Sequence, residues 1–151
     1  MSLSNVSSDL VWEVVRSQNS FLVKRKGAGG VQFSRDPYNL TNVHSRKHAG
    51  FVNDKAISIS AGEKNGVQVT TKKAGSANKP AKSTHNASHS GAKNSRSVYK
   101  AVANLSAKNG YRPDLREAAV QRASAVRQSQ RPVKPDQEKK PRGNKAKKAE
   151  E

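Results

Sequence analysis

The sequence predicts a small α+β fold: a short N-terminal helix and two β-hairpins, followed by two C-terminal helices and a disordered basic tail. Apolar residues recur at helical spacing near the N-terminus and in the C-terminal half, and short β-type runs form two pairs around glycine-containing loops. Only 32% of the 151 residues are hydrophobic, below the roughly 45–50% of average soluble domains. Only part of the chain can therefore form a packed core.

Composition and patterning divide the chain into four parts. Residues 1–72 are predicted to form a small α+β domain, and residues 73–94 a basic low-complexity linker. Residues 95–131 are predicted to form two basic amphipathic helices, and residues 132–151 a disordered basic tail rich in Lys and Pro.

A short amphipathic helix is predicted from Asp9 to Gln18, where apolar residues recur at helical spacing. Ser7 or Ser8 can cap its first turn, and Asp9 is favourable beside the positive end of the helix. The Asn19-Ser20 pair ends it.

Two hairpins are predicted to follow this helix. Strands at 21–23 and 31–34 surround the glycine-rich turn at 27–30, and strands at 56–60 and 67–70 form the second pair. The glycine cluster lacks a following Gly-Lys-Ser/Thr and does not open a helix, so we interpret it as a turn and not as a phosphate-binding loop.

Residues 73–94 contain no aliphatic side chain larger than Ala. Such a segment cannot form a core, so we expect a linker or an extension that follows RNA.

Two helices are predicted in the C-terminal half. The first runs from about Arg96 to Lys108 with Ser95 as its candidate cap, and the second opens at Pro113, where the missing N–H costs nothing. Asn109-Gly110 separates them. Their apolar stripes are Val98, Ala101, Val102 and Leu105 in the first helix and Leu115, Ala119, Ala123 and Val126 in the second.

Positive charge dominates the chain. Lys and Arg number 29 against 11 Asp and Glu, a formal net charge of +18, and the stretch from Lys64 to Arg112 contains no acid. Self-repulsion of this size favours a polyanionic partner. RNA is favoured over DNA because no helix-turn-helix, zinc finger or zipper is visible. The candidate RNA-binding residues are Lys24, Arg25, Lys26, Arg46, Lys47, His48, Lys72, Lys73, Arg96, Lys100, Arg112, Arg116, Arg122, Arg127 and Arg131.

Other classes of function find little support. The absence of Cys excludes disulfides, thiolate-bound zinc and thiol catalysis. The pairs His44/His48 and His85/His89 have i, i+4 spacing but lie in no predicted helix, so solvated or phosphate-facing histidines are expected. We expect no enzyme, no cofactor, no metal and no small-molecule substrate. No membrane segment is expected either, because no apolar run approaches the roughly 18 residues that a transmembrane helix requires.

Several segments, in order, resemble one known family: Leu10-Val-Trp-Glu-Val-Val-Arg16, Asn19-Ser-Phe-Leu-Val-Lys24, Val31-Gln-Phe-Ser34, Asn39-Leu40, Lys47-His-Ala-Gly50, Lys100-Ala-Val-Ala-Asn104 and Tyr111-Arg-Pro-Asp-Leu-Arg-Glu-Ala-Ala119. They resemble the eukaryotic large-ribosomal-subunit protein twenty-eight family, of the e-type. The Tyr-Arg-Pro-Asp-Leu string is the most specific match.

This resemblance implies a structural constituent of the cytosolic large subunit that binds ribosomal RNA and neighbouring ribosomal proteins and is assembled in the nucleolus. It also implies a small α+β domain with C-terminal helices on the RNA. Contacts within 73–94 and after Lys134 cannot be carried over, because the match is poorest there.

Two alternatives stay open on the sequence. A nucleolar ribosome-assembly factor with a related N-terminal domain would be expected to be longer and to carry acidic C-terminal segments. A histone-like DNA-compacting protein would share the charge and the Ala/Lys-rich tail, but it would not need Trp12, two hairpins or the string at Tyr111.

Overall fold

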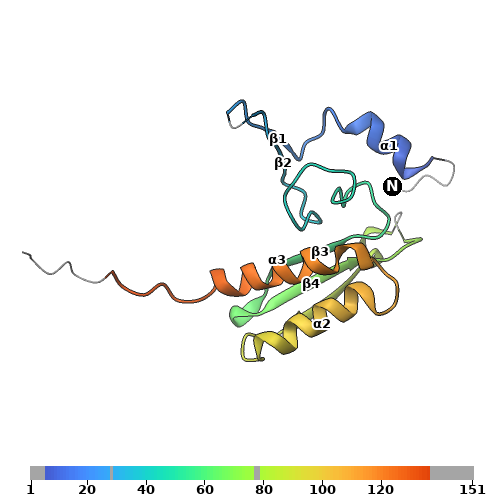
Figure 1. The fold of residues 1–151 in the computed structure, drawn as a ribbon. Helices are drawn as coiled ribbons and strands as arrows, with labels where there is room; N and C mark the ends of the chain where they lie inside the picture. The colour runs from blue at the N-terminus through green and yellow to red at the C-terminus, as the bar shows by residue number, and fades with distance from the viewer. Residues whose placement is uncertain (1–5, 28, 77–78, 137–151) are drawn as a thin grey trace, which may run out of the picture.

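The computed structural model describes residues 6–27, 29–76 and 79–136. Within these residues, three α-helices and two antiparallel sheets form two regions, with the first helix and hairpin in one and the larger sheet with the C-terminal helices in the other (Figure 1). The predicted α+β class is confirmed. Residues 132–136 have no regular secondary structure, and the rest of the predicted tail lies outside the described residues.

Helix α1 spans Ser8–Val15 and is capped by Ser7, whose side-chain oxygen accepts a hydrogen bond from the Leu10 N–H at 3.2 Å. The helix ends earlier than the predicted Gln18. The side-chain amide of Asn19 donates to the Val15 carbonyl at 3.1 Å, and such local side-chain bonds compete with a further helical turn.

The first hairpin pairs β1 (Leu22–Lys24) with β2 (Gln32–Ser34) in antiparallel register. An isolated bridge between Phe33 and Val43 adds a third extended segment beside β2. Gly29 and Gly30 in the turn have φ values of +75° and +77°, which glycine adopts without strain.

The second hairpin pairs β3 (Ile57–Ala61) with β4 (Val67–Lys72), as predicted. A short 3-10 helix, η1 (Glu63–Asn65), forms the loop between them.

The segment predicted to be a linker contains a strand. After the 3-10 helix η2 (Pro80–Lys82), β5 (Thr84–His89) pairs with β4 along its whole length, so the sheet order is β3-β4-β5. An edge strand is held chiefly by backbone hydrogen bonds to its neighbour. It therefore needs no large aliphatic side chain, and Ala87 opposite Val69 is enough.

Helix α2 spans Ser95–Ala107, and its cap is Asn94 and not Ser95, because the Asn94 side chain accepts from the Arg96 N–H at 3.1 Å. The second C-terminal helix begins with a 3-10 turn, η3 (Pro113–Leu115), and continues as α3 (Arg116–Ser129).

The main core lies between the three-stranded sheet and helices α2 and α3. The buried stripes of both helices pack on inward-facing residues of β3 and β4, so the predicted boundary at residue 72 does not separate two cores. The buried residues of this main core are Leu40, Ile57, Ile59, Val67, Val69, Val98, Val102, Leu115, Ala119 and Ala123.

A second, smaller cluster attaches α1 to the loop that precedes β3. It consists of Trp12, Ala49 and Val52, with Phe51 packed against it. The Phe51 ring also lies 5.4 Å, centroid to centroid, from the Phe21 ring, which links the first hairpin to the same loop.

Candidate nucleic-acid interface

Most of the predicted RNA-binding cations lie on the surface. Within the part of the chain that the structure describes, the exposed members form no side-chain hydrogen bond or ion pair. They are Lys24, Arg25, Lys26, Lys47, Lys73, Arg96, Lys100, Arg116 and Arg131.

Exposed cations are crowded at two places in the fold. Lys24, Arg25 and Lys26 are consecutive at the end of β1, and Arg96 and Lys100 are one helical turn apart on α2. Like charges at such spacing destabilise a free protein and favour a phosphate-bearing partner.

Arg46, by contrast, is a structural residue. Its Nη2 donates to the Ser8 side chain at 2.8 Å and to the Asp9 carboxylate at 2.7 Å, and its Nη1 donates to Asn53. It therefore joins the start of α1 to the loop before β3.

Arg112 and Lys72 also donate to carbonyls of this loop. Arg112 donates to the carbonyls of Lys55 at 2.8 Å and Lys47 at 3.0 Å, while Asp114 accepts its Nε and Nη2 at 2.8 and 2.7 Å. Lys72 donates to the Gly50 carbonyl at 2.5 Å. Burial lowers the pKa of Lys72, and the nearby carboxylates of Asp36 and Asp54 oppose this shift.

Arg127 ties α3 to the loop between β5 and α2. Its Nη2 donates to the carbonyls of Gly91 at 3.1 Å and Lys93 at 3.2 Å. Acids are scarce in this chain, so backbone carbonyls accept from these internal cations. Arg46, Lys72, Arg112 and Arg127 thus each donate hydrogen bonds within the protein.

His48 and Arg122 are only partly exposed. Burial lowers the pKa of His48, and the positive charges of Lys47 and Arg112 lower it further. The lowered pKa favours the neutral imidazole, which is a weaker partner for phosphate than a cation.

His44 also differs from the expected solvated histidine. Its ring lies 5.0 Å from the Trp12 ring, and its Nε2 lies 2.8 Å from the Arg16 carbonyl oxygen. His85 and His89 lie in β5. Among the described residues, no three His, Cys, Asp or Glu side chains are grouped to hold a metal ion.

Tyr111 has a role that sequence reasoning missed. Its hydroxyl donates to the Lys72 carbonyl at 2.6 Å and accepts from the Ala56 N–H at 3.2 Å, so it joins the beginning of β3 to the end of β4. Burial raises the pKa of Tyr111 and keeps the hydroxyl protonated. The most specific string in the sequence therefore begins with two residues, Tyr111 and Arg112, that hold the fold together.

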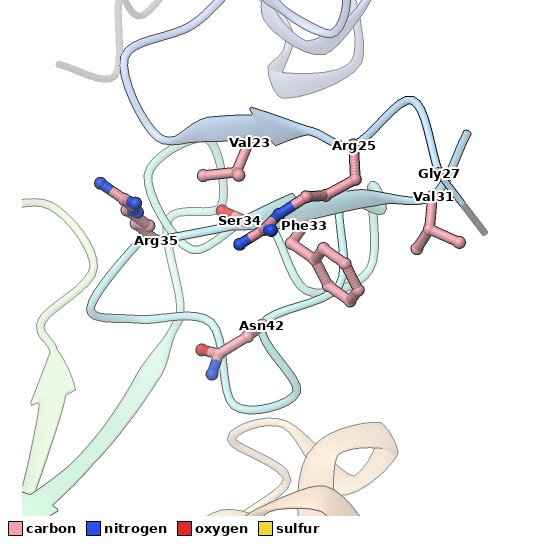
Figure 2. Close-up of a pocket in the computed structure, with 8 residues that line it drawn as sticks. All are labelled: Val23, Arg25, Gly27, Val31, Phe33, Ser34, Arg35 and Asn42. Carbon is pink, nitrogen blue, oxygen red and sulfur yellow. The ribbon is translucent and has the colours of Figure 1, made fainter. Parts of the chain in front are cut away.

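A second missed group surrounds a shallow depression on the first hairpin. Phe33, Arg35 and Asn42 line it together with Val23 and Arg25 (Figure 2). The alternation of Val31, Phe33 and Arg35 was the available signal, because alternate residues of a strand share a face.

The three-stranded sheet has one face that the helices do not cover. Alternation places small polar side chains there, in contrast to the valines and isoleucines of the core face. They are Ser58, Ser60, Gln68, Thr70, Asn86 and Ser88.

Comparison with known proteins gives consistent matches. Residues 10–129 match the profile of the Ribosomal L28e protein family. The chain is 43% identical over 131 residues to a Schizosaccharomyces pombe protein named large ribosomal subunit protein eL28, covering 86% of this chain and 97% of that one.

More distant relatives carry the same name. The Trypanosoma cruzi protein is 36% identical over 118 residues, covering 78% of this chain and 73% of the relative. The Dictyostelium discoideum protein is 34% identical over 130 residues, covering 85% and 92%.

None of the helices in the described part of the chain has the length and apolar character that crossing a bilayer requires.

Proposed function

The chain belongs to the Ribosomal L28e protein family, and we propose that it is a structural constituent of the large subunit of the cytosolic ribosome. The observation that carries this proposal is the family match over residues 10–129, which span nearly all of the described helices and strands. Relatives that match most of this chain are named large ribosomal subunit proteins.

In this proposal the protein binds and stabilises ribosomal RNA through Lys and Arg contacts with phosphates. Each phosphate that a side chain neutralises releases condensed counterions, which provides affinity without any catalytic step. The proposed contacts are the exposed cations at the end of β1, on α2 and near the two ends of α3, together with Lys47 and Lys73.

The internal cations have a separate role in the proposal. Arg46, Lys72, Arg112 and Arg127 fix the loops between elements by hydrogen bonds to side chains and carbonyls. They hold the exposed cations in a defined arrangement, which lowers the conformational entropy lost when RNA binds.

The proposed partners are large-subunit ribosomal RNA and neighbouring ribosomal proteins. The proposed location is the cytosolic ribosome, with assembly in the nucleolus. The uncovered polar face of the three-stranded sheet offers hydroxyl and amide groups that can hydrogen-bond the 2′-hydroxyls and phosphates of RNA.

Sedimentation of the tagged full chain from cells tests this proposal. We expect the chain to travel with mature large subunits and with translating ribosomes, and to stay bound after a high-salt wash. Presence only in nuclear precursor particles would instead indicate an assembly factor. Release with chromatin after nuclease digestion of DNA would indicate a DNA-compacting protein.

A further inference from the structure

One face of the first hairpin is apolar and exposed. The register places Val23 directly opposite Phe33, and the isolated bridge places Val43 on the other side of Phe33, so the three side chains form a row across three extended segments. Phe33 is 42% exposed and Val43 is 44% exposed. An aromatic ring in this position has one side available to a partner.

Two arginines flank this row. Arg25 lies beside Val31, whose carbonyl accepts the Arg25 N–H at 3.2 Å. Arg35 lies two residues after Phe33 along the chain. In Figure 2 the Arg25 side chain extends across β2 on the side where Phe33 lies, and Arg35 lies toward the opposite end of the strand. None of the described residues that line the depression is acidic.

Asn42 completes the site from the neighbouring loop. Its carbonyl accepts the Ser34 N–H at 2.8 Å, and its backbone has a φ of +56°, in the left-handed region that Asn tolerates better than most residues. Asn42 thus lies at the edge of the depression, with its side chain directed away from the Phe33 ring (Figure 2). The depression spans about 920 Å³ and is largely open to solvent.

We propose that this face binds an unpaired nucleobase of ribosomal RNA. The base stacks on Phe33, and Arg25 and Arg35 contact the phosphates on its two sides. This inference rests on the proposed function and adds to it a site for single-stranded RNA.

The positive charge of this face favours RNA over an apolar protein segment as its partner. An apolar peptide would cover Val23, Phe33 and Val43 but would leave the two guanidinium groups without anionic partners. A nucleotide supplies a flat ring and a phosphate together, and aromatic side chains on sheets are a common platform for unstacked bases. Lys24 and Lys26 beside Arg25 add positive charge at the same place.

Two binding measurements on the full chain test the proposal. One uses a labelled oligouridine and the other a duplex RNA of equal length, both at the same fixed salt concentration. Phe33→Ala should weaken oligouridine binding by roughly 5- to 150-fold, the range found for loss of one base–aromatic stack. Duplex binding should change little, because its bases are not available for stacking. Leu10→Ala, at a residue on α1 that is 57% exposed, is the matched control and should leave both affinities unchanged.

Two further variants separate stacking from simple apolar contact and from misfolding. Phe33→Tyr keeps the ring and should bind oligouridine like the parent. Phe33→Leu keeps an apolar side chain but has no ring, and should lose most of the affinity that Phe33→Ala loses. Equal oligouridine binding by the parent, Phe33→Ala and Phe33→Leu would overturn the inference.

Sedimentation of the same variants distinguishes this inference from the proposed function. If the parent and Phe33→Ala both enter large subunits and Phe33→Ala binds oligouridine normally, only the proposed nucleobase site is wrong. If Phe33→Ala binds oligouridine normally but no longer enters large subunits, the face contacts a neighbouring protein, which also overturns the inference. If the parent never enters large subunits, the proposed function itself fails.

Discussion

Gly50 shows how closely the loop before β3 is packed. A Cβ atom at this position would collide with the Cβ atom of Tyr38 and lie 2.8 Å from the Tyr38 carbonyl oxygen. The Gly50 carbonyl also accepts from Lys72. Since the same loop carries Lys47 and Arg46, its backbone position decides where a proposed RNA contact lies.

Gly50→Ala should therefore destabilise the protein. Relieving the collision requires the loop to move, at a cost of about 1–3 kcal/mol, which should lower the Tm by about 2–10 °C. Thermal unfolding followed by circular dichroism measures the change. Gly27→Ala is the matched control, because no atom of the described residues lies within 4 Å of the Cβ it would add. Equal Tm values for the two variants would show that the loop is not closely packed.

His48 makes stability depend on pH. Burial and the neighbouring charges of Lys47 and Arg112 lower its pKa below the ordinary value of 6.5, and burial and Lys93 lower the pKa of His89 in the same way. The unfolded chain then binds more protons than the folded chain between the lowered and the ordinary pKa values, so stability rises with pH across this window.

We accordingly expect the Tm to fall as the pH is lowered below about 6.5. A double variant, His48→Gln with His89→Gln, should reduce this dependence, because Gln does not titrate. The measurement is the Tm at a series of pH values between about 5 and 8. A parent and double variant with the same pH profile would exclude the two histidines as its cause.

At the scale of elements, helices were easier to predict from the sequence than the third strand. The stripes of α2 and α3 were correct because a helix packs a regular apolar face, and Leu115, Ala119 and Ala123 are buried as expected. β5 was missed because its pairing with β4 depends on backbone hydrogen bonds and not on apolar alternation.

The candidate site was predictable only in part for a related reason. Sequence shows which residues are cations, and most of the candidates are exposed. The sequence does not show which of these cations donate hydrogen bonds to backbone carbonyls far along the chain, as Arg112 does to Lys47 and Arg127 does to Gly91. These contacts exist only once the sheet and helices have packed.

Helix α3 carries both kinds of arginine, which allows a direct comparison. Arg116→Glu with Arg131→Glu changes exposed residues at the start of α3 and just beyond its end, so the helix should persist while incorporation into large subunits falls, since Glu forms helices well and repels phosphate. Arg127→Glu should instead lower stability by about 1–3 kcal/mol, because the Gly91 and Lys93 carbonyls lose a charged donor.

Sedimentation and thermal unfolding of the two variants separate these effects. Should the Arg116/Arg131 variant assemble as well as the parent, α3 is not an RNA-binding element and the end of β1 becomes the main candidate. An Arg127→Glu variant with unchanged Tm would show that its carbonyl contacts contribute little.

For the molecule as a whole, the imbalance of charge is the dominant property. A formal net charge of +18 is spread over a protein in which the described ion pairs are Arg16–Glu13, Arg46–Asp9 and Arg112–Asp114. Most of the positive charge therefore has no acidic partner within the described chain. These cations either remain solvated or contact phosphates of RNA. The two cases differ in how steeply RNA binding weakens as salt is added.

Binding of the full chain to large-subunit ribosomal RNA should weaken steeply as salt is added. If about eight phosphates are neutralised, the logarithm of the association constant should fall with the logarithm of the salt concentration at a slope of roughly −6 to −7. Filter binding at several salt concentrations measures this slope. The Arg116/Arg131 variant should have a slope smaller by roughly 1–2, whereas Phe33→Ala, which removes no charge, should bind more weakly at the same slope. A parent slope near −1 would mean that the positive charge is mainly solvated surface, and the phosphate contacts proposed for this protein would then be wrong.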